Sequence, residues 1–278
     1  MIQRLTSLDS VMDFIRDVQQ DPVFSDPMLS TDEQWENNLL RSVKREDEEA
    51  LCVYRDGKLA GFFVFQITAA DRNLEMIVGL SRQVEVYTEI ADYLQEKYPG
   101  FQADFVFNPR NYLLRELLEQ KGADFDPEQQ KMTFSGKAPE VEAEGIVPLA
   151  DEYMEQYAAM HNTDMFWTAE KVAKRPDRFS VFLAVDQGKV VGYIDVTNCY
   201  GENEIYDILV QEEYRRKGWG RKLLGKSLKE NEPKRMMLLV FVNNEPAIPL
   251  YESMGFVKVD GQNSITVFWH MRDEKKDK

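Results

Sequence analysis

One short pattern occurs twice in this chain, and the repeat limits the folds that the chain can adopt. Residues 51–67 and 182–196 each carry alternating apolar residues on both sides of a turn that contains the spelling G-K-x-x-G. Alternation with a period of two around a glycine turn predicts a β-hairpin. The two turns begin at Gly57 and Gly188. The fold must therefore accommodate two similar hairpins that lie far apart in the sequence.

The elements around the hairpins also repeat in the same order. Each half begins with a short strand and helical segments, then has the hairpin, a third strand, a helix, a strand, a helix and closing strands. In the first half we expect helices at 10–19, 31–43, 84–97 and 111–122, and single strands at 74–80 and 102–107. In the second half we expect helices at 151–161, 168–175, 218–229 and 245–254, and single strands at 204–210 and 235–242. Each half is thus an α+β unit, and an internal duplication is the simplest interpretation. Two unrelated α+β domains are the alternative.

A polar stretch at residues 135–145 divides the chain near its middle. It is rich in small and charged residues and lacks apolar periodicity, which indicates a linker. We therefore expect one domain at residues 1–136 and a second at residues 144–272. Each is long enough to bury its own core.

Composition argues against several classes of function. No run approaches the roughly 20 apolar residues that span a bilayer, and the first residues lack a signal-peptide core, so we expect a cytoplasmic protein without a membrane anchor. The two cysteines, Cys52 and Cys199, and the two histidines, His161 and His270, are far apart in the sequence, so no metal site is expected. A net charge of −15 argues against nucleic-acid binding, which depends on Lys and Arg. The sequence indicates no particular oligomeric state.

Against this acidic background one basic segment differs from the rest. Six basic residues and no acidic residue lie between Arg215 and Lys226, where a strand runs through a glycine turn into an amphipathic helix. Gly218 and Gly220 lack the Cβ atoms that would hold a ligand away from the backbone. The first N–H groups of a helix have no internal partner, and the helix dipole adds partial positive charge there. The segment predicts an anion-binding cradle. A solvated basic helix face with a packing pair of glycines is the alternative.

The spelling of this turn excludes two common nucleotide-binding motifs. Gly218 does not begin the G-x-x-x-x-G-K-[ST] pattern of a P-loop. Residues 218–223 lack the third glycine of a dinucleotide fingerprint, and the turn comes late in its domain.

Residues 215–220, with the sequence RRKGWG, instead resemble the R/Q-x-x-G-x-G/A signature of the GNAT superfamily of acyl-CoA N-acyltransferases. Residues 243–256 resemble the second signature of that family, N-x-x-A-x-x-L-Y-x-x-x-G-F. The resemblance covers residues 145–271 closely and residues 1–134 in outline.

The resemblance implies two tandem GNAT-like domains, each with a mixed, mostly antiparallel sheet flanked by helices. It also implies an acetyl-CoA-dependent N-acetyltransferase that moves an acetyl group to a primary amine by direct attack. Acetyl-CoA would be the cosubstrate, no metal would be needed, and the acceptor would be an amine of a small molecule or a peptide. A non-catalytic acyl-CoA-binding or interaction module is the alternative.

The resemblance assigns a binding role to main-chain groups on either side of the turn. The strand that ends at Val210 would bind the pantetheine arm and the acetyl carbonyl, and the Val210 N–H could stabilise negative charge on that oxygen. The glycine turn would hold the pyrophosphate, and Asn244 would contact the cofactor. The expected cofactor-binding residues are Ile208, Leu209, Val210, Arg215, Arg216, Lys217, Gly218, Trp219, Gly220, Arg221, Asn244 and Tyr251.

Two residues are expected to carry the proton transfers. Tyr251 stands at the position of the family's general acid, and a phenol can donate a proton to the leaving thiolate; a buried core aromatic is the alternative. Glu204 stands where the histone-acetylating branch has its base, and a solvated charge at the end of a strand is the alternative. Because side chains alternate along a strand, Asp207 is expected on the opposite face from Glu204, and either could reach the substrate. Some ribosomal-protein-acetylating relatives take a glutamate base from the next strand. This chain has Leu239 there, which excludes that version of the base.

The first half departs from the family pattern. Leu118 occupies the position of Tyr251, and residues 81–86 contain no glycine and fewer positive charges. We therefore expect that the first domain does not bind acetyl-CoA productively. Aromatic residues that could line the acceptor pocket, or simply belong to the core, are Phe166, Trp167 and Tyr200.

Overall fold

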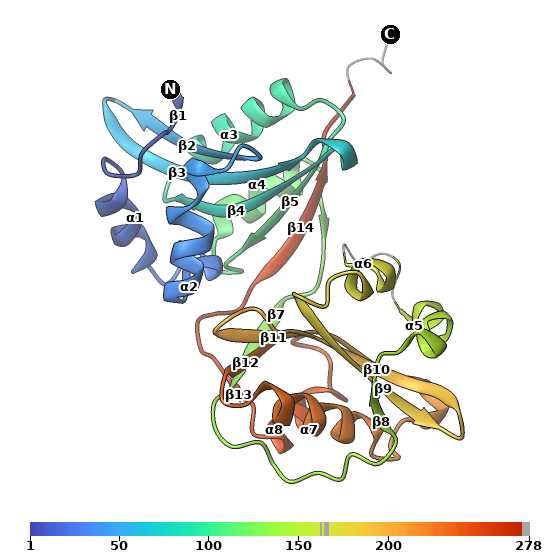
Figure 1. Cartoon of the computed structure of the whole chain (residues 1–278). Coiled ribbons are helices and arrows are strands. Elements are labelled where there is room, and N and C mark those ends of the chain that lie inside the picture. The colour runs from blue at the N-terminus through green and yellow to red at the C-terminus, as the bar shows by residue number, and fades with distance from the viewer. Residues whose placement is uncertain (162, 164–166, 274–278) are drawn as a thin grey trace. The chain divides into compact units, whose positions relative to one another are not determined.

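The structure is a computed structural model that describes residues 1–161, 163 and 167–273. These residues form two compact units (Figure 1). The first unit contains Met1–Gln129 and the segment that begins at Asp260, and the second contains Gln130–Val259. Within the described residues each unit has one seven-stranded sheet with helices packed against it, which confirms the expected tandem α+β fold. None of the helices in this part of the chain is both long and apolar enough to cross a bilayer.

The sheet of the first unit is antiparallel except for one central pair. Its strands lie in the order β1 (Ile2–Arg4), β2 (Glu48–Arg55), β3 (Lys58–Thr68), β4 (Asn73–Ser81), β5 (Gln102–Phe107), β14 (Ile265–His270) and β6 (Asp124–Phe125). Only β4 and β5 run parallel. Helices α3 (Val84–Lys97) and α4 (Tyr112–Gln120) bury one face of the sheet. Helix α1 (Met12–Gln19) and the short α2 (Asp32–Gln34), with the π-helical turn after it, lie on the other side.

The sheet of the second unit has the same plan. Its strands lie in the order β13 (Val257–Lys258), β7 (Gln129–Phe134), β12 (Arg235–Phe241), β11 (Glu202–Val210), β10 (Lys189–Thr197), β9 (Phe179–Asp186) and β8 (Ile146–Pro148). Strands β11 and β12 are parallel, as β4 and β5 are in the first unit. Helices α7 (Trp219–Asn231) and α8 (Ile248–Ser253) cover one face, and α5 (Met154–Met160) and α6 (Ala169–Ala173) cover the other. The matching parallel pair supports an internal duplication.

The closing strands of the two halves are exchanged between the sheets. Strand β7 comes from the end of the first half but belongs to the second sheet, beside β12. Strand β14, red in Figure 1, comes from the end of the second half but pairs with β5 in the first sheet. The compact units therefore place residues 130–136 and 260–272 on the other side of the division that we expected from the sequence. The expected boundaries missed this exchange because an alternating strand can complete either sheet.

The polar stretch at residues 135–145 contains no helix or strand, but it is not a free linker. Ala138 is only 6% exposed and belongs to the core of the second unit. Val141 passes so close to α7 that a Cβ atom at Gly225 would lie 2.6 Å from the Val141 Cβ. The segment is therefore fixed against α7.

The strand exchange predicts which fragments of the chain can fold. A fragment of residues 130–259 keeps every strand of the second sheet, whereas a fragment of residues 144–272 lacks β7 and carries β14 without its partner. Thermal unfolding followed by circular dichroism should show a cooperative transition for the first fragment and none for the second. A cooperative transition of the 144–272 fragment at the same temperature would contradict this account.

In the first unit, one side chain fills the gap that opens where β4 and β5 separate. The two strands pair only from Asn73 to Met76, so residues 77–81 have an edge without a strand partner. The Asp26 carboxylate, 2% exposed, accepts hydrogen bonds from the Gly79 N–H (2.7 Å) and the Met28 N–H (2.8 Å). Burial raises the pKa of Asp26 to about 7, although the two hydrogen bonds stabilise the ionised carboxylate and oppose the rise.

This raised pKa makes a prediction for stability. Asp26 titrates near 3.8 in the unfolded chain and near 7 in the folded chain, so at pH 5 the folded chain holds the extra proton. This extra proton binding stabilises the folded chain, and the stabilisation is lost as the pH rises through the folded-state pKa. Between pH 5 and pH 8, urea unfolding should therefore show wild type losing about 2 kcal/mol of stability relative to Asp26→Asn.

Asp21, in the same segment, provides the control. Its pKa is lowered, although burial opposes the shift, because the Val23 N–H and Arg82 bind its carboxylate. It is therefore ionised in both states throughout this pH range. The difference between wild type and Asp21→Asn should not change from pH 5 to pH 8. A difference for Asp26→Asn that is equally flat would show that its carboxyl group is not buried as described.

Candidate cofactor and catalytic site

Strand β11 separates from β12 halfway along its length. The parallel pairing runs from Glu202 with Arg235 to Ile205 with Leu238 and then stops. Residues 206–210 remain in β11, and all but Tyr206 pair with β10 on the other side. A strand edge without a partner presents free N–H and C=O groups. Of the expected main-chain ligands, Ile208 and Val210 direct their N–H and C=O groups to this open edge. Those of Leu209 point to β10, as the Gln211 N–H does in donating to the Val191 carbonyl.

A β-bulge at Tyr206 changes the direction of the side chains that follow it. Val196 of β10 pairs with Ile205, and Asp195 pairs with Asp207, so Tyr206 is an extra residue in β11. Paired residues share a face of the sheet, and the bulge therefore places Asp207 on the same face as Glu204. The expectation that these two carboxylates lie on opposite faces is wrong. Simple alternation could not reveal the bulge, because it depends on the partner strand.

The turn before α7 holds its backbone in an unusual conformation. Arg216 has φ +62° and Gly218 has φ +89°, and α7 begins at Trp219. In the described structure no group accepts a hydrogen bond from the N–H groups of residues 216–221. A Cβ atom at Gly218 would meet no atom within 4 Å, so the space in front of it is open. Such a run of free N–H groups is a concave anion-binding site.

The second glycine of the turn has a different role. A Cβ atom at Gly220 would lie 3.1 Å from the Leu250 Cδ2 and 4.0 Å from the Val210 Cγ2. Gly220 therefore allows α7 to pack closely against α8 and the end of β11. Both glycines were expected to clear space for a ligand, but only Gly218 faces open space in this geometry.

The basic residues around the turn carry charge that acidic residues largely do not balance. Of the six, only Lys226 forms an ion pair with a described carboxylate, that of Glu230 at 2.6 Å. Arg215 Nε donates to the Val210 carbonyl (3.0 Å), and Arg221 Nη1 donates to Ser253 Oγ (3.1 Å). Neither partner is charged, so these hydrogen bonds do not neutralise the two guanidinium groups. The ammonium groups of Lys217 and Lys222 lie over the rings of Tyr214 and Trp219, respectively.

Tyr251 lies on α8 with its ring in the core of the α7 side. It is 7% exposed and packs edge-on against Phe256, and no described group hydrogen-bonds its hydroxyl. Burial, with a smaller effect of the Asp207 charge, raises the pKa of Tyr251 to about 12. The phenol is therefore protonated at neutral pH. Asn244 lies just before α8, where its Oδ1 accepts from the Ala247 N–H at 3.3 Å, so it also supports the helix start.

Glu204 is half-buried on the α5 side of the sheet. Its N–H donates to Thr197 Oγ1 at 2.7 Å, while no described group hydrogen-bonds its carboxylate. Burial raises the pKa of Glu204 to about 7, and the charges of Lys131 and Arg178 oppose the rise. A carboxyl group with this pKa can accept and release a proton at neutral pH.

A buried polar network on the same face was missed from the sequence. Asp195 is fully buried; the Tyr157 hydroxyl donates to it (2.8 Å), and His161 Nε2 lies 2.8 Å from its Oδ2. The Tyr193 hydroxyl donates to Asp207 Oδ2. The only feature of the sequence that points to this network is the four-residue spacing of Tyr157 and His161, which puts both on one helix face.

Two of the aromatic residues expected near the acceptor, Trp167 and Tyr200, lie beside Arg178. Trp167 packs against Phe179 at 5.1 Å between ring centroids, and the Arg178 guanidinium lies over the rings of both Trp167 and Tyr200. Phe166 lies outside the described residues.

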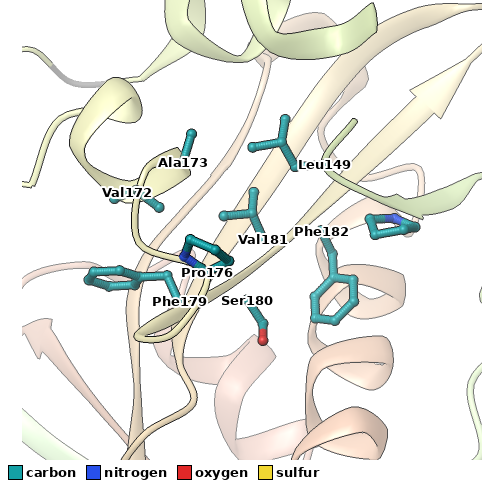
Figure 2. A pocket seen from close by; sticks show the side chains of 9 residues that line it. Leu149, Val172, Ala173, Pro176, Phe179, Ser180, Val181 and Phe182 are labelled. Carbon is teal, nitrogen blue, oxygen red and sulfur yellow. The ribbon is translucent and has the colours of Figure 1, made fainter. Parts of the chain in front are cut away.

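A separate pocket lies between α6 and the open edge of β9 (Figure 2). Its lining has no ionisable side chain, so it cannot supply acid–base chemistry. The lining residues are Pro148, Leu149, Val172, Ala173, Pro176, Phe179, Ser180, Val181 and Phe182.

Comparison with known proteins finds a family match for the part of the chain that contains this site. Residues 146–256 match the model of the acetyltransferase (GNAT) family. An N-alpha-acetyltransferase of Saccharolobus solfataricus is 35% identical over 94 residues, which make up 28% of this chain and 56% of that protein. The chain thus spans little more than half the length of that curated relative.

Solved structures resemble the chain over nearly its whole length. A GCN5-related N-acetyltransferase from Sphaerobacter thermophilus has a TM-score of 0.68 at 16% identity, covering 98% of this chain and 96% of that one. A tandem GNAT protein from the clavulanic acid biosynthesis pathway has a TM-score of 0.57 at 12% identity, covering 98% of each chain. At these identities the likeness shows the fold. The chain therefore has the fold of a tandem GNAT protein, and within it residues 146–256 of the second unit match the acetyltransferase (GNAT) family model.

Proposed function

We propose that the second unit transfers an acetyl group from acetyl-CoA to a primary amine. The observation that carries this proposal is the run of free N–H groups at residues 216–221, beside the open edge of β11. Acetyl-CoA matches both parts, because its pyrophosphate is an anion and its pantetheine arm contains amides that can pair with a strand edge. The surrounding basic residues favour the same polyanionic ligand.

Each part of the site then has one task in binding. The amides around Gly218 hold the pyrophosphate, and Arg216 and Lys217 add positive charge. The main chain of residues 208–210 holds the pantetheine arm. The Val210 N–H stabilises negative charge on the acetyl oxygen. Arg215 fixes the end of the strand through the Val210 carbonyl.

The proton transfers come from the two faces of the sheet. Acetyl-CoA supplies a thioester that an amine can attack directly. An amine with a pKa of about 10.4 is neutral in only about one molecule in 2,500 at pH 7, so Glu204 accepts its proton. Tyr251 donates to the leaving sulfur. Glu204 is on the α5 side and Tyr251 on the α7 side. The gap between β11 and β12 lets the amine and the thioester meet from opposite faces.

The first unit has no equivalent site under this proposal. In the register of the two parallel strand pairs, Gly79 corresponds to Ile208. Its N–H is already bonded to the buried Asp26 carboxylate, which repels an anionic ligand when ionised. Leu118, at the position of Tyr251, is fully buried and has no proton to donate.

The cradle can be tested with two matched glycine substitutions. Gly218→Ala strains a backbone at φ +89° and puts a methyl group into the space for the pyrophosphate. Gly188→Ala strains a hairpin turn at φ +82°, also with no atom within 4 Å of the new Cβ. Both should lose about 1 kcal/mol of stability. Calorimetry should show acetyl-CoA binding weakened roughly tenfold or more in Gly218→Ala alone. Equal affinities in the two variants would contradict the cradle.

The proton-transfer roles can be tested by thiol release from acetyl-CoA with a panel of amines. Tyr251→Phe should lower kcat roughly 100-fold while acetyl-CoA affinity is retained, because only the donated proton is lost. Tyr98→Phe, the same kind of change in the first unit, should not change kcat. If wild type binds acetyl-CoA but releases no thiol with any amine, the second unit is instead a non-catalytic acyl-CoA-binding module.

A further inference from the structure

Strand β7 carries a buried lysine, Lys131, on the face of the second sheet where Glu204 lies. We propose that Lys131 is a positioning residue that keeps enough of Glu204 ionised at neutral pH for it to act as a base. This inference rests on the proposed function. It assigns a role to a residue from outside the family-matched region, which begins at residue 146.

The geometry places the Lys131 ammonium beside the acidic side of β11. Lys131 is 5% exposed, and its Nζ lies 3.4 Å from Glu202 Oε2, although β12 separates their strands. Glu202 and Glu204 lie two residues apart in a stretch of β11 that pairs regularly with β12. Residues two apart in a strand point to the same face. The ammonium is therefore on the face that carries the Glu204 carboxylate.

Two cations lie beside Glu202, the carboxylate that precedes Glu204 on this face. Glu202 pairs with Lys131 and also with Arg235, whose Nη2 lies 3.0 Å from Glu202 Oε1. One carboxylate thus faces two cations. Glu204, the next carboxylate on this face, has no hydrogen-bond partner in the described part of the chain. Burial raises the pKa of Glu204 to about 7. The positive charges of Lys131 and, to a smaller extent, Arg178 oppose this rise.

Other ionisable groups lie on the same face of the sheet as Glu204 and come from several elements. Tyr206 and Asp207 follow it in β11, Asp195 lies on β10, and Tyr157 and His161 lie on or at the end of α5. Arg178 precedes β9. All of these groups stay in place when Lys131 or Glu202 is replaced. Comparing variants at these two positions therefore isolates the effect of the lysine charge.

A direct titration of Glu204 in the full chain tests the proposal. Carbon-13 NMR of protein labelled at the glutamate carboxyl carbons follows each titration, and the Glu204 signal is identified by its loss in Glu204→Gln. The midpoint should be near 7 in wild type. It should rise by roughly one pH unit in Lys131→Met, because a nearby positive charge is lost. Lys131→Arg, which keeps the charge, should stay close to wild type. An unchanged midpoint in Lys131→Met would overturn the proposal.

A second variant covers the case in which Lys131→Met does not fold. Glu202→Gln removes the negative charge that competes for Lys131, so the Glu204 midpoint should fall below that of wild type. An unchanged or raised midpoint in Glu202→Gln would also overturn the proposal. The NMR titration needs neither turnover nor an acceptor. Failure of the proposed function would instead appear as absent thiol release, or as thiol release with the same pH dependence in wild type and Glu204→Gln.

Discussion

The site depends on the early separation of two parallel strands. Strand β11 continues beyond its last pair with β12 at Ile205, and its remaining N–H and C=O groups on that edge need a partner. The two units meet this need differently. In the first unit, Asp26 supplies an acceptor from within the chain. In the second, the edge stays open and leads directly into the free amides around Gly218. The proposed ligand, acetyl-CoA, has amides that could pair with the strand edge and a pyrophosphate that could bind the free N–H groups.

The environments of the two expected proton carriers follow from their positions on opposite faces of the same sheet. Tyr251 lies in the apolar core beside α7, and burial keeps its phenol protonated. Glu204 is on the other face, where Lys131 and Arg178 oppose the effect of burial on its pKa. Lys131 belongs to the second sheet only because the closing strands are exchanged. Under the role proposed for Lys131, the exchange brings a residue from before position 146 to the site of the second unit.

Local patterns predicted much of the fold. The expected helix at residues 84–97 and the strand at 102–107 coincide with α3 and β5, and the glycine turn lies at the start of α7 as expected. Features set by distant partners could not be predicted. The destination of β14 depends on which sheet edge is free, and the bulge at Tyr206 depends on the register with β10. The buried carboxylate of Asp26 lies in an ordinary turn sequence before Pro27, with no pattern that distinguishes it.

Hydrogen exchange of the full chain, with and without saturating acetyl-CoA, measures the central claim most directly. Acetyl-CoA should slow amide exchange within residues 206–221, above all at residues 216–221, whose N–H groups have no partner in the described structure, and should leave residues 77–86 of the first unit unchanged. Unchanged exchange at 206–221 under saturating ligand, or equal slowing at 77–86, would contradict the claim.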